Sequence, residues 1–154
     1  MITAVFASYK MTAEQQSDVS IGNITELKGN GRVVREHAPY DAALSFGIES
    51  FDNVETSNGR MGITFLNDTQ VRLTEHSELL IDEFIYDPNP SKSRMALNFT
   101  SGTARFITGK LNNINKENIA IKTPSANVSI RGTDFTLTVN ELGESLIILL
   151  PKDD

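Results

Sequence analysis

The feature that most constrains this chain is a two-residue alternation of apolar and polar side chains, repeated between short turns. It is clearest over residues 119–139, where Phe135, Leu137 and Val139 alternate with aspartate and threonine. Apolar residues at every second position, rich in Val, Ile, Thr and Phe, predict half-buried strands. Turns are expected at Thr123-Pro124-Ser125 and at Gly132-Thr133, because proline lacks a backbone N–H and glycine accommodates a sharp corner.

The same alternation runs through the rest of the chain, with turn signals about every eight to twelve residues. The sequence predicts a hairpin around Gly29-Asn30-Gly31 and a loop over residues 37–43. Residues 2–9 are expected to form a short strand, and residues 11–19 a loop or one helical turn. No helical pattern longer than two turns is convincing. Further turns are predicted at Ser57-Asn58-Gly59, Asn67-Asp68, residues 87–91 and Ser101-Gly102.

The fold class expected from this pattern is all-β, with short stacked strands in a sandwich-like, barrel or stacked-coil arrangement. The length of 154 residues suits one domain with a core of its own. We expect an N-terminal strand or loop extension over residues 1–20 and a β domain over residues 21–154. With no cysteine in the chain, disulfides and thiolate metal sites are excluded.

Composition argues against two classes of partner. The formal net charge is −6 and the charges are dispersed, whereas nucleic-acid binding relies on a basic surface that neutralises phosphates. No stretch approaches the roughly twenty apolar residues that span a bilayer. Residues 1–8 lack the positive start of a secretory signal, and Lys10 interrupts them. We therefore expect no nucleic acid, no membrane and no secretion by the general route.

Residues with possible chemistry each have a structural alternative. Metal binding by Glu75, His76 and Glu78 is disfavoured, because strand spacing puts Glu75 and His76 on opposite faces. Calcium binding by Asp82, Glu83 and Asp87 is disfavoured, because the ligand alternation around a central glycine is missing. No nucleophilic elbow and no cysteine is present, and His37 and His76 are the only histidines. The expectation is a non-enzyme with no cofactor and no metal.

The apolar run near the end of the chain, residues 145–151, points to association. It is apolar on both faces of any strand, so it needs cover from the N-terminal strand, a partner chain or a further coil, or else ordinary core burial. The candidate subunit contact comprises Leu146, Ile147, Ile148, Leu149 and Leu150.

Several short pieces follow one another in a fixed order along the chain. The pieces are Gly31-Arg32-Val33, Leu44-Ser45-Phe46-Gly47 with Asp52-Asn53-Val54-Glu55-Thr56, Gly59-Arg60-Met61-Gly62-Ile63-Thr64-Phe65, Ser77-Glu78-Leu79-Leu80-Ile81, Thr100-Ser101-Gly102-Thr103-Ala104-Arg105-Phe106, and Ile121-Lys122-Thr123-Pro124 ending in Arg131-Gly132-Thr133-Asp134-Phe135. Each piece is weak alone, but their order and spacing are quite specific, and together they make the chain resemble a FecR-like domain over about residues 24–139. Asn67-Asp68 departs from the Asp-Gly type of turn usual in the family.

The resemblance implies a compact β-solenoid-like module of stacked coils, with a corner formed by Thr123, Pro124, Arg131, Gly132, Thr133 and Asp134. Arg131 and Asp134 could bind a ligand, but pairing with each other or with backbone is the favoured interpretation. In membrane-bound regulators of this family the module lies in the periplasm, follows a transmembrane helix and receives a signal from an outer-membrane transporter, while the cytoplasmic end controls a sigma factor. This chain carries neither that helix nor the sigma-binding segment, so only the domain is carried over.

Two functions follow as expectations. The first is a non-enzymatic structural or interaction module that assembles into a larger complex, such as a bacteriophage tail or baseplate. Its partners would be other protein subunits, as a homo-oligomer or as neighbours in the particle, and it would lie in the virion or in the cytoplasm during assembly. The alternative is a periplasmic signalling or sensory domain of a FecR-type sigma-factor regulator, which binds a protein by strand addition at an exposed edge.

Overall fold

The computed structural model describes residues 20–85, 94–107, 119–129 and 134–149, and over these residues the protein is entirely β-structure. The all-β prediction is confirmed. The predicted elements at residues 2–9, 11–19 and 87–91 and the Gly132-Thr133 corner lie outside the described residues. The strands are β1 (Gly22–Lys28), β2 (Gly31–Arg35), β3 (Ala38–Asp41), β4 (Gly47–Ile48), β5 (Asn53–Thr56), β6 (Arg60–Phe65), β7 (Gln70–Leu73), β8 (Glu78–Ile85), β9 (Arg94–Ile107), β10 (Ile119–Lys122), β11 (Asn127–Ser129), β12 (Asp134–Val139) and β13 (Ser145–Leu149).

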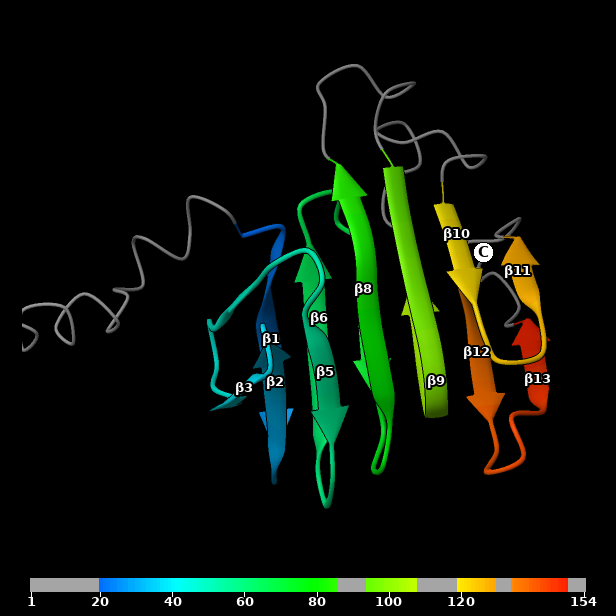
Figure 1. Cartoon of the computed structure of the whole chain (residues 1–154), viewed down its shortest axis with the longest axis horizontal. Helices are drawn as coiled ribbons and strands as arrows, with labels where there is room; N and C mark the ends of the chain where they lie inside the picture. The colour runs from blue at the N-terminus through cyan, green and yellow to red at the C-terminus, as the bar shows by residue number, and fades with distance from the viewer. Residues whose placement is uncertain (1–19, 86–93, 108–118, 130–133, 150–154) are drawn as a thin grey trace, which may run out of the picture.

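The strands form one sheet that curls at β9 into two halves. The main path runs β3-β2-β5-β8-β9-β7-β6-β1-β4. Residues 94–101 of β9 pair with β8 and β10 in the front half, and residues 102–107 pair with β7 and β12 in the back half. Strands β11 and β13 continue the front and back halves beyond β10 and β12. Figure 1 shows the halves as two layers, with β5 and β8 in front of β6.

The core lies between the two halves. The residues that alternation placed inward on β6, β7, β8, β9 and β12 are buried, which confirms that part of the prediction. Phe65 of β6 stacks on Phe84 of β8 with ring centroids 5.6 Å apart, and this contact joins back to front. Phe106 and Phe135 stack at 5.1 Å within the back half. One apolar cluster therefore serves both halves.

The hairpin predicted at Gly29-Asn30-Gly31 is wrong, because the two flanking strands do not pair with each other, although the chain does turn sharply at Gly29. Gly29 has a φ of 72°, but β1 pairs with β6 and β4, while β2 pairs with β3 and β5. The chain bends there from the back half to the front half. The partner ribbon bends back at Asn58-Gly59, and a Cβ on Gly29 would lie 2.3 Å from the carbonyl oxygen of Asn58. Only glycine permits this close approach of two backbones.

The turn predicted at Ser101-Gly102 is also wrong, because β9 continues through it without a break. Gly102 has a φ of 95°, and a Cβ there would lie 2.2 Å from Ser77 Oγ. At this residue β9 passes from the front half to the back half. The opposing chain bends between β7 and β8, where His76 has a φ of 56°.

These crossings form a line of bends along one side of the sandwich. Ser57 N donates to Asn30 O at 3.2 Å, and His76 N donates to Ser57 O at 3.0 Å. Thr103 N then donates to Ser77 Oγ at 3.1 Å. The bend line comprises Gly29-Asn30, Asn58-Gly59, Glu75-His76 and Gly102.

The loop predicted over residues 37–43 is in part a strand, β3. It forms a hairpin with β2 across Glu36 and His37, whose φ values of 50° and 67° suit a tight turn between twisted strands. Pro39 is tolerated because β3 lies at an edge and, among the described strands, pairs with β2 alone.

Of the sandwich-like, barrel and stacked-coil forms predicted for the all-β fold, the sandwich-like one fits the two packed halves of the sheet. Among the described strands, β9 and β10 are the one parallel pair, and all other pairs are antiparallel. A solenoid of stacked coils pairs its strands in parallel from coil to coil. The solenoid-like form therefore finds no support in the pairing.

Candidate functional site

The corner residues that the structure describes have structural roles. Thr123 Oγ1 accepts from Ala126 N at 3.0 Å and lies 2.6 Å from Ser145 Oγ, which ties the β10–β11 turn to β13. Asp134 accepts from Arg105 Nε at 3.0 Å, across β12 and β9. Pro124 lies within the β10–β11 turn. Arg131, Gly132 and Thr133 lie outside the described residues, so pairing of Arg131 with Asp134 stays a prediction.

The candidate metal ligands are dispersed or otherwise engaged. His76 lies at the bend line, and Glu78 accepts from Asn53 Nδ2 at 2.7 Å and from Thr100 Oγ1 at 2.9 Å. Asp82 and Glu83 belong to β8, and Asp87 lies outside the described residues. Within the described ranges, no three His, Cys, Asp or Glu side chains converge on a point where a metal could bind.

A buried cation that sequence reasoning missed lies at the end of the front half. The guanidinium of Arg35 donates to both carboxylate oxygens of Asp52, at 2.8 and 2.7 Å, and to the carbonyl of Gly47 at 2.9 Å. It also lies over the rings of Tyr40 and Phe46. Asp52 is fully buried. The signal was present, because Arg35 shares the inward face of β2 with Val33, where an arginine needs partners.

Glu49 is the third charged residue of this cluster, and its contact with Arg35 is less favourable than that of Asp52. Its Oε2 lies 2.8 Å from Arg35 Nη1, yet the pair lacks the alignment of a hydrogen bond, and this buried oxygen has no other partner among the described residues. Burial raises the pKa of Glu49 above its ordinary value, and the nearby charge of Arg35 opposes that rise. The cluster joins β2, β3, β4 and β5 and acts as a brace.

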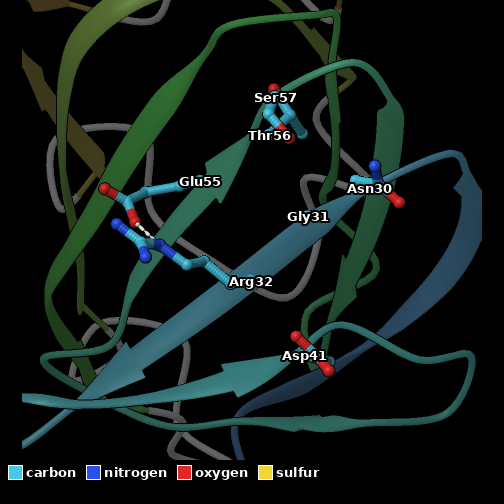
Figure 2. A pocket seen from close by; sticks show the side chains of 7 residues that line it. All are labelled: Asn30, Gly31, Arg32, Asp41, Glu55, Thr56 and Ser57. Carbon is cyan, nitrogen blue, oxygen red and sulfur yellow. Dashed lines mark hydrogen bonds and ion pairs between the residues drawn. The ribbon is translucent and has the colours of Figure 1, made fainter.

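A polar depression lies beside the bend line in the front half (Figure 2). It encloses about 370 Å³, and Arg32 Nε pairs across it with Glu55 Oε2 at 2.5 Å. Asp41 reaches it from β3. Because Glu55 already neutralises the one arginine, the depression offers hydrogen-bonding groups and no evident reaction centre. The lining residues are Asn30, Gly31, Arg32, Asp41, Glu55, Thr56 and Ser57.

Strand β13 is the feature with the clearest capacity for recognition. Leu146, Ile147 and Ile148 are 60%, 43% and 49% exposed, although all three are large and apolar. Leu146 and Ile148 lie opposite Thr138 and Thr136 on the outward face, and Ile147 lies opposite the buried Leu137 at the rim of the core. The predicted contact run is thus exposed where the structure describes it. The side chain of Leu149, and all of Leu150, lie outside the described residues.

The other described edges are blocked in ways that β13 is not. Strand β3 carries Pro39 and Asp41, β4 has two residues, and β11 has three. Strand β13 has five residues, Ser-Leu-Ile-Ile-Leu, with no charge, proline or glycine, and among the described strands it pairs with β12 alone. Natural proteins protect exposed edges with short strands, charges or proline unless another chain is to pair there. Among the described strands, β13 is therefore the edge that lacks these protective features.

One comparison with known proteins identifies a family for this chain. Residues 52–150 match the model of a family described as FecR protein. This match covers the pieces from Asp52 onward that carried the resemblance, and it extends through β13. No curated protein and no solved structure gave a match. No helix long and apolar enough to span a membrane occurs in the part of the chain that the structure describes.

Proposed function

This chain belongs to the FecR family, and from that premise we propose that it is a non-enzymatic protein-recognition domain of the signalling type. Its partner adds a strand to the unpaired edge of β13. Strand addition gains affinity from main-chain hydrogen bonds, and specificity from the side chains on either side of the added strand.

The observation that carries this proposal is the combination of an unprotected edge and apolar exposure on one strand. The exposed side chains of Leu146 and Ile148 form an apolar stripe on the outward face, and the exposed side chain of Ile147 lies at the rim of the core. Large apolar side chains gathered at one edge are typical of protein contacts. The Ser145 hydroxyl, held by Thr123, fixes the start of this strand.

Site-specific crosslinking in the native host tests the proposal. A photoreactive amino acid replaces Ile148, and in a matched variant it replaces Tyr40, which is similarly exposed but lies on the proline-protected edge strand β3. We expect one crosslinked partner of defined mass from position 148 and none from position 40. Slower hydrogen exchange of the β13 amides in the complex distinguishes strand addition from contact by side chains alone. Absence of any crosslink at 148 contradicts the proposal.

Assembly into a larger particle, such as a phage tail or baseplate, is the second candidate function. The exposed strand alone does not separate it from the first candidate, since subunits of a particle also join through apolar edges. The crosslinked species separates the two candidates. A second copy of this chain or a particle protein supports assembly, and a component of a membrane signalling complex supports the regulator function.

A further inference from the structure

The outward face of the back half carries a hollow of about 470 Å³ with an unusual arrangement of charge. Strand pairing sets one row of outward residues directly opposite one another across β1, β6, β7, β9 and β12. A second row next to it begins with Lys28 opposite Arg60 and continues through Thr74 and Thr103. The first row comprises Glu26, Gly62, Arg72, Arg105 and Thr136.

Like charges face each other twice in these rows. Arg72 lies opposite Arg105, and Lys28 lies opposite Arg60. Like charges directly opposite each other destabilise an antiparallel pair, so a face shaped by stability alone would alternate their signs. An anion bound between the facing cations would offset this repulsion.

Two carboxylates offset part of this charge. Glu26 Oε2 lies 3.3 Å from Arg72 Nε, and Asp134 accepts from Arg105. Lys28 and Arg60 form no ion pair with any residue that the structure describes. Among the described residues, four cations and two carboxylates leave this groove with an excess of positive charge, in a chain whose net charge is −6.

We propose that this cationic groove binds an acidic peptide segment of a partner protein, with closely spaced carboxylates. Guanidinium groups bind carboxylates through paired charge-assisted hydrogen bonds. The exposed hydroxyl of Thr74 donates to Thr103 O at 3.2 Å, and its oxygen can still accept from a peptide N–H. The volume suits a few residues rather than a folded domain. Nucleic acid fits poorly, because no aromatic residue lines the groove and the chain as a whole repels a long polyanion. This site uses none of the β13 residues and does not rest on the proposed strand addition.

Fluorescence anisotropy with a fluorescein-labelled hexaglutamate peptide tests the groove, at an ionic strength of about 0.1 M, where the Debye length is about 10 Å. The variant is Lys28→Gln with Arg60→Gln, which removes the two cations that form no ion pair with described residues and leaves no carboxylate orphaned. The matched control is Arg94→Gln with Lys122→Gln, an equal loss of charge at exposed positions of the front half.

We expect the groove variant to weaken hexaglutamate binding by about tenfold or more, which corresponds to about 1.4 kcal/mol. The control is expected to change it by less than about twofold, as a distant, screened charge should. Removing a like-charged pair is also expected to leave the melting midpoint unchanged or higher. Equal weakening in both variants, absence of hexaglutamate binding to the wild type, or equally tight binding of an oligothymidylate would each overturn the proposal, while leaving strand addition at β13 untouched.

Discussion

At the scale of the residue, the arginine that braces the front half shows how a buried charge is tolerated. Arg35 has two carboxylates, a carbonyl and two aromatic rings around it, so its charge is compensated, and its Nε and Nη2 groups donate hydrogen bonds. Removing one partner from such a pair typically destabilises a protein by about 3–5 kcal/mol, because the remaining charge stays buried. The brace therefore holds the chain from β2 to β5 together.

The titration of Glu49 makes the stability of the Arg35 cluster depend on pH. Its pKa is raised in the folded protein by burial, so folding favours the protonated form. The stability that this group contributes is present at pH below its ordinary pKa of 4.5 and is lost as pH rises through the raised value. The Glu49→Gln variant lacks this titration. We therefore expect wild type to lose stability relative to Glu49→Gln as pH rises above about 4.5.

Urea unfolding at a series of pH values measures this difference. The exposed Glu141→Gln serves as the control, since it removes one carboxylate outside the cluster. A stability difference between wild type and Glu49→Gln that stays constant across the pH range would contradict the assignment.

Sequence patterns predicted inward residues well and charged ones poorly. Apolar alternation identified Phe135, Leu137 and Val139 as core, because a period of two has one buried face. The same pattern puts Arg35 inward beside Val33, but its partners Glu49 and Asp52 come from a different part of the chain. Such a long-range pairing leaves no local signal.

At the scale of the element, β9 depends on one backbone conformation. Gly102 has a φ of 95°, and its Cα faces Ser77 too closely for a Cβ. We expect Gly102→Val to destabilise the protein by about 1–3 kcal/mol from backbone strain alone, with the steric clash adding to this. The midpoint of urea denaturation measures the effect. The neighbouring Ser101→Val adds the same side chain without that φ, and an equal loss in both variants would rule out the bend as the cause.

A second prediction at this scale concerns strand β13 and its association with another chain. Because Ile148 is half exposed and faces outward, we expect Ile148→Lys to fold with a melting midpoint close to that of wild type. The charge is expected to prevent pairing at this edge, as lysine does on natural edge strands. Analytical ultracentrifugation and the crosslinking assay read out association. An unfolded product would instead place Ile148 in the core.

Strand positions were predictable, but their partners were not. A glycine-asparagine turn such as Gly29-Asn30 looks the same in sequence whether the flanking strands pair or pass into separate layers. The two flanking strands lie in separate halves because β1 pairs with β6 in the back half and β2 pairs with β5 in the front half. The apolar strand β13 was predictable because an apolar run on both faces is a local feature, whereas its role as a subunit contact stays a prediction. The cationic groove was not, since its rows come from residues 26–136 brought together by pairing.

At the scale of the whole molecule, the shared strand β9 and the common core make the two halves one cooperative unit. Phe135→Ala in the back half is expected to cost about 3–5 kcal/mol, because it removes a ring stacked on Phe106. We expect the most protected amides of β5 and β8 in the front half to lose as much hydrogen-exchange protection as those of β6 and β7. Thr136→Ala, on the outward face of the same strand, is the control. Loss confined to the back half would show that the halves unfold separately.

The bend line has a consequence for how such a chain can change in length. At this line the chain crosses between the two layers four times, and hydrogen bonds or close backbone contacts join the crossings. An added residue in any one crossing would shift the register of the strands in one layer relative to those in the other. Ile85 pairs with Arg94 at the end of the β8–β9 ladder that is opposite to Ser101, and Ile107 ends β9 on the other side of Gly102. Insertions, whether from evolution or from an engineer grafting a foreign loop, are therefore expected to be accepted directly after Ile85 and Ile107 and refused at the glycines of the bends.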